Sequence, residues 1–224
     1  MIPLLFALSA LAAEPLAAGP LAAGPLAGGP VTYTVDPAQG LVYVVVRKDP
    51  DTVLAGLSHD HVIRAGALSG TVTWDPGDPA TCVVRLELPV TALDVDPQWL
   101  RDQVGFPQRL NDGDRQTIRR HMLDPGQLHA SAHPTISFAS TRCTAAGGAT
   151  VVEGTLEVRG QAAPIRASMT VEADGQRLSA RGGFETTHAA FGMQPYQAAL
   201  GALKNQAGLR FEVQVVATAG PAHQ

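Results

Sequence analysis

Short segments in which apolar and polar residues alternate recur along most of the chain. The clearest are residues 82–88, with the sequence CVVRLEL, and residues 209–215, with the sequence LRFEVQV. Because successive side chains of a strand point to opposite faces of a sheet, each segment predicts one apolar and one polar face. Many such strands with few helices between them either stack as a sandwich or close into a barrel. A barrel interior is either filled or hollow, and that interior is the first place to look for function.

The alternating segments are separated by turn signals. We expect strands at residues 33–36, 41–47, 53–65, 67–74, 82–90, 135–142, 150–159, 165–173, 178–187 and 209–218. The Asp174-Gly175 pair between two of them is a strong signal for an antiparallel hairpin. Residues 98–105 and 112–123 predict two short helices. The sequence therefore predicts an all-β fold, an eight-stranded antiparallel barrel with one or two short inserted helices, wide enough for side chains or one slim ligand.

The first 30 residues depart from this pattern. Residues 1–13 carry no charge and are too short to span a bilayer, so we interpret them as a signal peptide. The basic residues that normally precede the apolar stretch are missing, and an uncleaved anchor or a misplaced start codon are the other interpretations. Residues 14–30 repeat Pro, Leu, Ala and Gly and predict a linker. Residues 31–219 then form one domain, which we expect to be periplasmic or secreted.

Charge and motifs exclude several classes of function. The net charge is −4, and charged residues make up 16% of the chain. Such a protein offers no basic field for nucleic acid. No stretch after the leader approaches 18 uninterrupted apolar residues, so we expect no stable membrane insertion of the mature domain. Hydrolase, phosphate-loop and His-Glu-x-x-His motifs do not occur, and we expect no catalysis.

The two cysteines, Cys82 and Cys143, are too few for a disulfide scaffold and lack the spacing of a zinc or redox site. Alternation places Cys82 on the same face as Leu86, but it places Cys143 opposite Phe138 on its own strand. This parity disfavours pairing, and a bulge would reverse it. A disulfide and two buried free thiols are therefore both open. A disulfide would close a loop of about 60 residues and stabilise the fold by about 4 kcal/mol.

Four pieces of sequence occur in a characteristic order and spacing. They are YTVD at residues 33–36, HPTISFAST at residues 133–141, a Gly-x-Leu-x-x-x-Gly hairpin from Gly154 followed by Pro164, and Phe191-Gly192. From about Tyr33 to Ala217 the chain thereby resembles the YceI-like family. The resemblance implies an exported protein with a lipocalin-like eight-stranded barrel that binds a polyisoprenoid or similar long lipid along its axis.

The interior of such a barrel would supply the binding site. The candidate lining residues are apolar and lie on predicted strands: Val44, Val46, Trp74, Leu86, Leu88, Phe138, Leu156, Met169, Phe184 and Phe211. A place in a packed core is the other interpretation of each of them. We expect the lipid as ligand, no cofactor, and a monomer or homodimer. A stress-related structural module with a filled barrel is an alternative function.

The most distinctive polar feature is His59-Asp60-His61. Residues i and i+2 of a strand share a face, so His59 and His61 are weak candidates for binding a metal. A metal centre needs a third ligand, for which the candidates are His121, His129, His133 and His188. A metal-dependent enzyme or redox accessory protein is the alternative function that this pair supports.

Four arginines crowd a loop and the second predicted helix: Arg109, Arg115, Arg119 and Arg120. If that helix covers the mouth of the barrel, these guanidinium groups would bind a phosphate head group. A solvated helix face is the other interpretation, because Asp112 and Asp114 partly neutralise the cluster.

Overall fold

The computed structural model describes residues 29–220. The predicted signal peptide and all but the end of the predicted linker lie outside these residues. Among the helices that the structure describes, none is long and apolar enough to cross a membrane.

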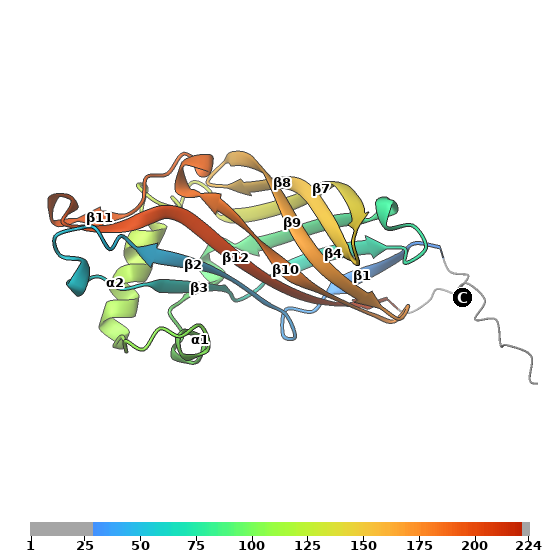
Figure 1. The fold of residues 1–224 in the computed structure, drawn as a ribbon, viewed down its shortest axis with the longest axis horizontal. Coiled ribbons are helices and arrows are strands. Elements are labelled where there is room, and N and C mark those ends of the chain that lie inside the picture. The colour runs from blue at the N-terminus through green and yellow to red at the C-terminus, as the bar shows by residue number, and fades with distance from the viewer. Residues whose placement is uncertain (1–28, 221–224) are drawn as a thin grey trace, which may run out of the picture.

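Eight antiparallel strands close into the predicted barrel (Figure 1). In spatial order they are β1 (Val31–Val35), β4 (Ser69–Trp74), β5 (Val83–Pro89), β7 (Thr135–Ala146), β8 (Ala149–Val158), β9 (Gln161–Ala173), β10 (Arg177–Thr187) and β12 (Leu203–Ala219). The last strand pairs with the first, Tyr33 lying opposite Ala219, and this pairing closes the ring. The all-β, eight-stranded prediction is therefore confirmed.

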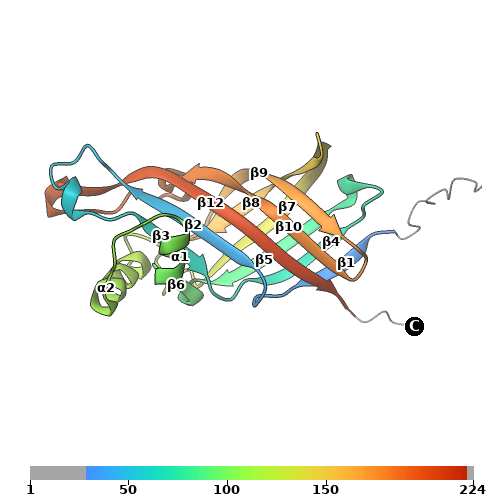
Figure 2. The same cartoon turned by 60° about the horizontal axis from the view of Figure 1, so that its bottom comes forward.

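Three further strands extend the wall at one end. β2 (Leu41–Lys48) pairs with the earlier part of β12, β3 (His61–Ala65) pairs with β2, and β6 (Leu93–Val95) pairs with β3. β1 and β2 both pair with β12. On their other edges β1 pairs with β4, and β2 pairs with β3. The three extra strands are thus continuations of β1, β4 and β5 beyond a break in each (Figure 2).

Two helices lie at this extended end. They are α1 (Gln98–Gln103) and α2 (Asp112–Leu123), both inserted between β6 and β7. The Asn111 side chain accepts a hydrogen bond from the Asp114 amide and thereby caps α2. Ile118 and Met122, one turn apart, pack against a cluster that includes Val90 and Leu93. α2 therefore covers the barrel wall with an apolar face, next to β6 (Figure 2).

Two predicted boundaries differ most from the structure. The predicted strand at residues 53–65 contains a short 3-10 turn, η1 (Ala55–Leu57), and only its end is β3. Lys48 Nζ donates to the carbonyls of Ala55 and Ser58, and these bonds favour a turn over a strand. β12 begins six residues before the predicted start, because β11 (Gln197–Ala198) forms a hairpin with it.

The cysteine pairing that the sequence leaves open is formed. Cys82 and Cys143 make a disulfide with their Cα atoms 5.9 Å apart. The pairing of β7 with β8 shifts between Ser140 and Arg142, so one residue of β7 is bulged. A bulge reverses the alternation beyond it, and Cys143 therefore points inward although it differs in parity from Phe138.

Candidate ligand-binding cavity

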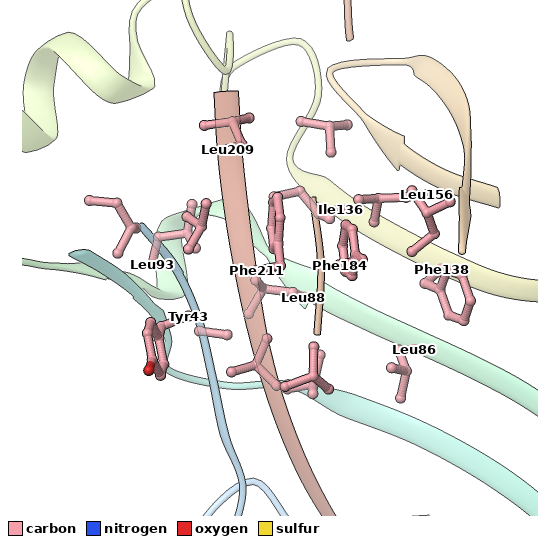
Figure 3. A pocket seen from close by; sticks show the side chains of 18 of the residues that line it. Tyr43, Leu86, Leu88, Leu93, Ile136, Phe138, Leu156, Phe184, Leu209 and Phe211 are labelled. Atoms are coloured by element: carbon pink, nitrogen blue, oxygen red, sulfur yellow. The ribbon is translucent and has the colours of Figure 1, made fainter. Parts of the chain in front are cut away.

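The barrel encloses a cavity of about 340 Å³. Its wall is built from the inward faces of the barrel strands and from residues of α2. Figure 3 shows side chains from several strands projecting toward this space. The interior is therefore hollow, and its volume lies within the range of about 300–1,000 Å³ that small-molecule sites occupy.

One side of the cavity is formed by a row across three strands. Val44 of β2 lies opposite Phe211 of β12, which lies opposite Phe184 of β10. The two phenyl rings are stacked with their centroids 4.5 Å apart. Because all three residues sit at the same level of neighbouring strands, they form one continuous apolar surface.

A second row lies on the other side. Leu86 of β5 lies opposite Phe138 of β7, which lies opposite Leu156 of β8. Gly154 leaves room for the Phe138 ring, since a Cβ there would stand 2.5 Å from two of its carbons. The ring can thus lie close to the wall, where it takes less of the cavity than it would if it pointed toward the axis (Figure 3).

Polar side chains line the cavity at the end where α2 and β11 lie. We call this set the polar rim; it consists of His61, His121, Gln127, His188, Tyr196 and Asn205. His121 stacks on Tyr196 with ring centroids 5.2 Å apart, and the backbone N–H of Asn205 donates to the backbone carbonyl of Tyr196. The cavity is therefore amphipathic along its length, with one apolar part and one end where a ligand can form hydrogen bonds.

A buried ion pair supports one residue of the polar rim. His61 Nδ1 lies 2.7 Å from a carboxylate oxygen of Asp96, and Arg101 Nη1 lies 2.6 Å from the other. Asp96 and Arg101 are 0% and 1% exposed. The Val62 amide also donates to Asp96. These bonds fix the orientation of the His61 ring.

The same contacts keep Asp96 ionised. Burial alone would raise the pKa of this carboxyl, but the hydrogen bonds from His61, Val62 and Arg101 outweigh burial and hold the pKa below its ordinary value. Asp96 is therefore an acceptor only, and each of its three partners must donate to it.

A family match decides the identity of the fold. The sequence model of the YceI-like domain matches residues 33–218. The chain belongs to the YceI-like family. The resemblance predicted from the four sequence pieces is thereby confirmed.

Solved structures with this YceI-like fold include BcnA from Burkholderia cenocepacia. It is 18% identical, with a TM-score of 0.60, and the match covers 82% of this chain and 99% of that chain. The YceI protein of Campylobacter jejuni is 13% identical, with a TM-score of 0.49 and coverage of 68% and 82%. No curated protein sequence matches this chain. At such identities the likeness to BcnA shows a common fold.

All the lining residues predicted from the sequence lie on the cavity wall of this YceI-like barrel. They are Val44, Val46, Trp74, Leu86, Leu88, Phe138, Leu156, Met169, Phe184 and Phe211. Their contact with a lipid stays a prediction. Sequence reasoning missed the contribution of the connections, above all Phe191 and Met193 after β10 and Leu128 after α2. Phe191 is 1% exposed. Its place in the Phe191-Gly192 piece of the family pattern is the sequence signal that could have identified it.

The histidine pair does not assemble a metal centre in the part of the chain that the structure describes. His59 precedes β3, and its ring centroid lies 6.4 Å from that of His61. Among residues 29–220 no three His, Cys, Asp or Glu side chains are placed to hold a metal ion. Burial, followed by the charges of His61 and Arg101, lowers the pKa of His59. Sequence spacing failed here because a strand was assumed at residue 59.

The arginine cluster lies outside the cavity. Arg115 pairs with Asp112 and also donates to the Leu110 carbonyl. Arg119 donates to the carbonyls of Leu93 and Thr91, so it attaches α2 to the barrel. Arg119 and Arg120 line a separate, shallow surface pocket. The predicted phosphate site is therefore not supported, because two guanidinium groups are engaged by the protein itself.

Proposed function

We propose that this protein is an exported carrier that binds a long isoprenoid-type lipid inside its barrel and has no catalytic activity. The observation that supports the proposal best is the hollow interior, about 340 Å³ in volume and apolar over most of its length. A cavity of this kind suits a ligand that is mostly hydrocarbon. Membership of the YceI-like family supports the same function.

The energetics are favourable without any polar contact. Burial of a CH₂ group yields about 0.8 kcal/mol, so three or four isoprene units yield on the order of 10 kcal/mol. Association costs about 4–15 kcal/mol in lost freedom, depending on the estimate used. Hydrophobic burial of a chain of this length therefore offsets the association cost except at the upper end of that range. The width of the cavity then selects the class of tail.

The proposed location rests on two features. One is the uncharged apolar segment at residues 1–13. The other is the Cys82–Cys143 disulfide, a type of bond that persists in oxidising compartments and is rare in the cytosol. Together they support export to the periplasm or beyond. The oligomeric state, monomer or homodimer, is open to sedimentation analysis.

Native mass spectrometry of the gently extracted full chain tests the carrier function. We expect a mass increment that matches a lipid. Ala180 lines the cavity and Arg181, the next residue of β10, is exposed. Ala180→Trp should fill the cavity and remove the increment, whereas Arg181→Trp on the outer face should retain it. A protein free of lipid in every preparation, including one offered an isoprenoid in vitro, would rule the proposal out.

A further inference from the structure

Two histidines of the polar rim, His61 and His188, lie near each other on the wall of the cavity. His61 of β3 lies opposite Val46 of β2, which lies opposite Leu209 of β12. His188 follows β10 directly and contacts the carbonyl of Ala207, two residues from Leu209. Three steps between neighbouring strands, each about 4.8 Å, separate the two residues along the curved wall.

His61 bonds to Asp96 through one ring nitrogen and leaves the other without a protein partner. Because Asp96 accepts only, Nδ1 of His61 donates to it, and in the neutral form of imidazole Nε2 then carries the lone pair. No buried side-chain nitrogen or oxygen among residues 29–220 lacks a partner. Nε2 is thus not sealed within the wall, and His61 lines the cavity.

His188 offers a second acceptor. Its Nδ1 lies 3.0 Å from the Ala207 carbonyl oxygen, so that nitrogen must donate. Burial lowers the pKa of His188, and the bond to Ala207 opposes this only in part. The ring is therefore neutral, with an unprotonated Nε2. Both histidines donate from Nδ1 through independent contacts, one to a carboxylate and one to a backbone carbonyl.

Two cationic side chains near the rim are already engaged by the protein. Arg101 is bound to Asp96 and to the Asp60 carbonyl. Lys48 Nζ is bound to the carbonyls of Ala55 and Ser58. Among the described residues, the lining of the cavity includes neither lysine nor arginine. A phosphate ester placed at the rim would lose water without gaining a counter-charge.

We propose that the polar rim is a head-group site for an uncharged hydroxyl, which donates its proton to Nε2 of His61 or of His188. This inference rests on the proposed function and refines it. The preferred ligand is then a long-chain isoprenoid alcohol. An ether or a carbonyl head group cannot donate to either imidazole and can bond only to donors such as Tyr196 and Asn205, and a phosphate ester is disfavoured because of its charge.

Three probes with the same tail test this proposal: geranylgeraniol, its methyl ether and its monophosphate. Binding is measured at about pH 8.5, where free imidazole is neutral. We expect the wild type to bind the alcohol about tenfold more tightly than the ether, as one hydrogen bond would give, and more tightly than the phosphate. Asparagine is chosen for the variants because its side-chain NH2 group can replace Nδ1 as a donor, while no atom of asparagine takes the place of Nε2 as an acceptor.

His61→Asn and His188→Asn should each reduce the preference for the alcohol over the ether, and the double variant should abolish it. His129→Asn, outside the rim, is the matched control and should keep the preference. Equal binding of alcohol and ether by the wild type, tighter binding of the phosphate, or a preference that survives in the double variant would each overturn the inference and leave lipid binding intact. Failure of all three probes to bind would reject the proposed function, and the head-group site with it.

Discussion

At the scale of single residues, Gly154 shows how the sequence keeps the barrel hollow. A Cβ at this position would stand 2.5 Å from the Phe138 ring and from the Ala139 carbonyl oxygen. We therefore expect Gly154→Ala to push the ring toward the axis and to lower the free energy of unfolding by about 1–3 kcal/mol, the usual effect of overpacking. Urea unfolding measures the loss, and lipid uptake measures the narrowing of the cavity.

Two variants make this prediction specific. Gly208→Ala is the control, because a Cβ at Gly208 meets no atom within 4 Å. Phe138→Leu combined with Gly154→Ala should recover part of the lost stability, since the smaller side chain relieves the contact. Strictly additive effects of the two substitutions would show that the ring and the glycine do not interact.

The alternation of apolar and polar residues predicted which side chains point inward wherever the strand is regular. Phe138, Leu156, Phe184 and Phe211 lie on regular strands, and each points into the cavity as its position in the pattern indicates. The His61–Asp96 contact was beyond such reasoning because 35 residues separate the partners in sequence. No local pattern reports a contact that depends on how β3 and the segment before α1 meet in the fold.

At the scale of elements, the bulge in β7 decides where the disulfide forms. Sequence parity placed Cys143 on the outer face, and the shift between Ser140 and Arg142 brings it inward to Cys82. The predicted start of β3 was wrong for a related reason. η1 is held by two hydrogen bonds, one from Lys48 Nζ to the Ala55 carbonyl and one from the Leu54 backbone amide to the Ala202 carbonyl. Bulges and turns of this kind depend on long-range partners, so a period of two residues cannot foresee them.

The disulfide should stabilise the barrel considerably. It joins residues 61 apart in sequence, and closing a loop of that size in the unfolded chain corresponds to about 4 kcal/mol in the chain-entropy model. We expect the double variant Cys82→Ala/Cys143→Ala to have a free energy of unfolding about 4 kcal/mol lower than that of the wild type, as measured by urea unfolding. Reduced wild type is the control and should match the variant. A difference below about 1 kcal/mol would show that the unfolded chain retains structure that already keeps these two segments close together.

At the scale of the whole molecule, a hollow barrel couples its stability to its cargo. A ligand that binds only the folded state stabilises it by RT ln(1 + [L]/Kd), about 2.7 kcal/mol when the free ligand is at 100 times Kd. Removal of lipid from the purified protein should therefore lower the melting temperature, and adding an isoprenoid alcohol back should restore it. For a protein of this size the shift would be roughly 5–10 °C.

The filled variant separates this coupling from other effects of delipidation. Ala180→Trp places side-chain atoms where the tail would lie, so its melting temperature should be the same with and without added lipid. Arg181→Trp, on the outer face of the same strand, should respond as the wild type does. An equal response of both variants would mean that lipid stabilises the protein from its surface, and the cavity would then have no part in binding. A response confined to proteins with an open interior would place the ligand inside the barrel.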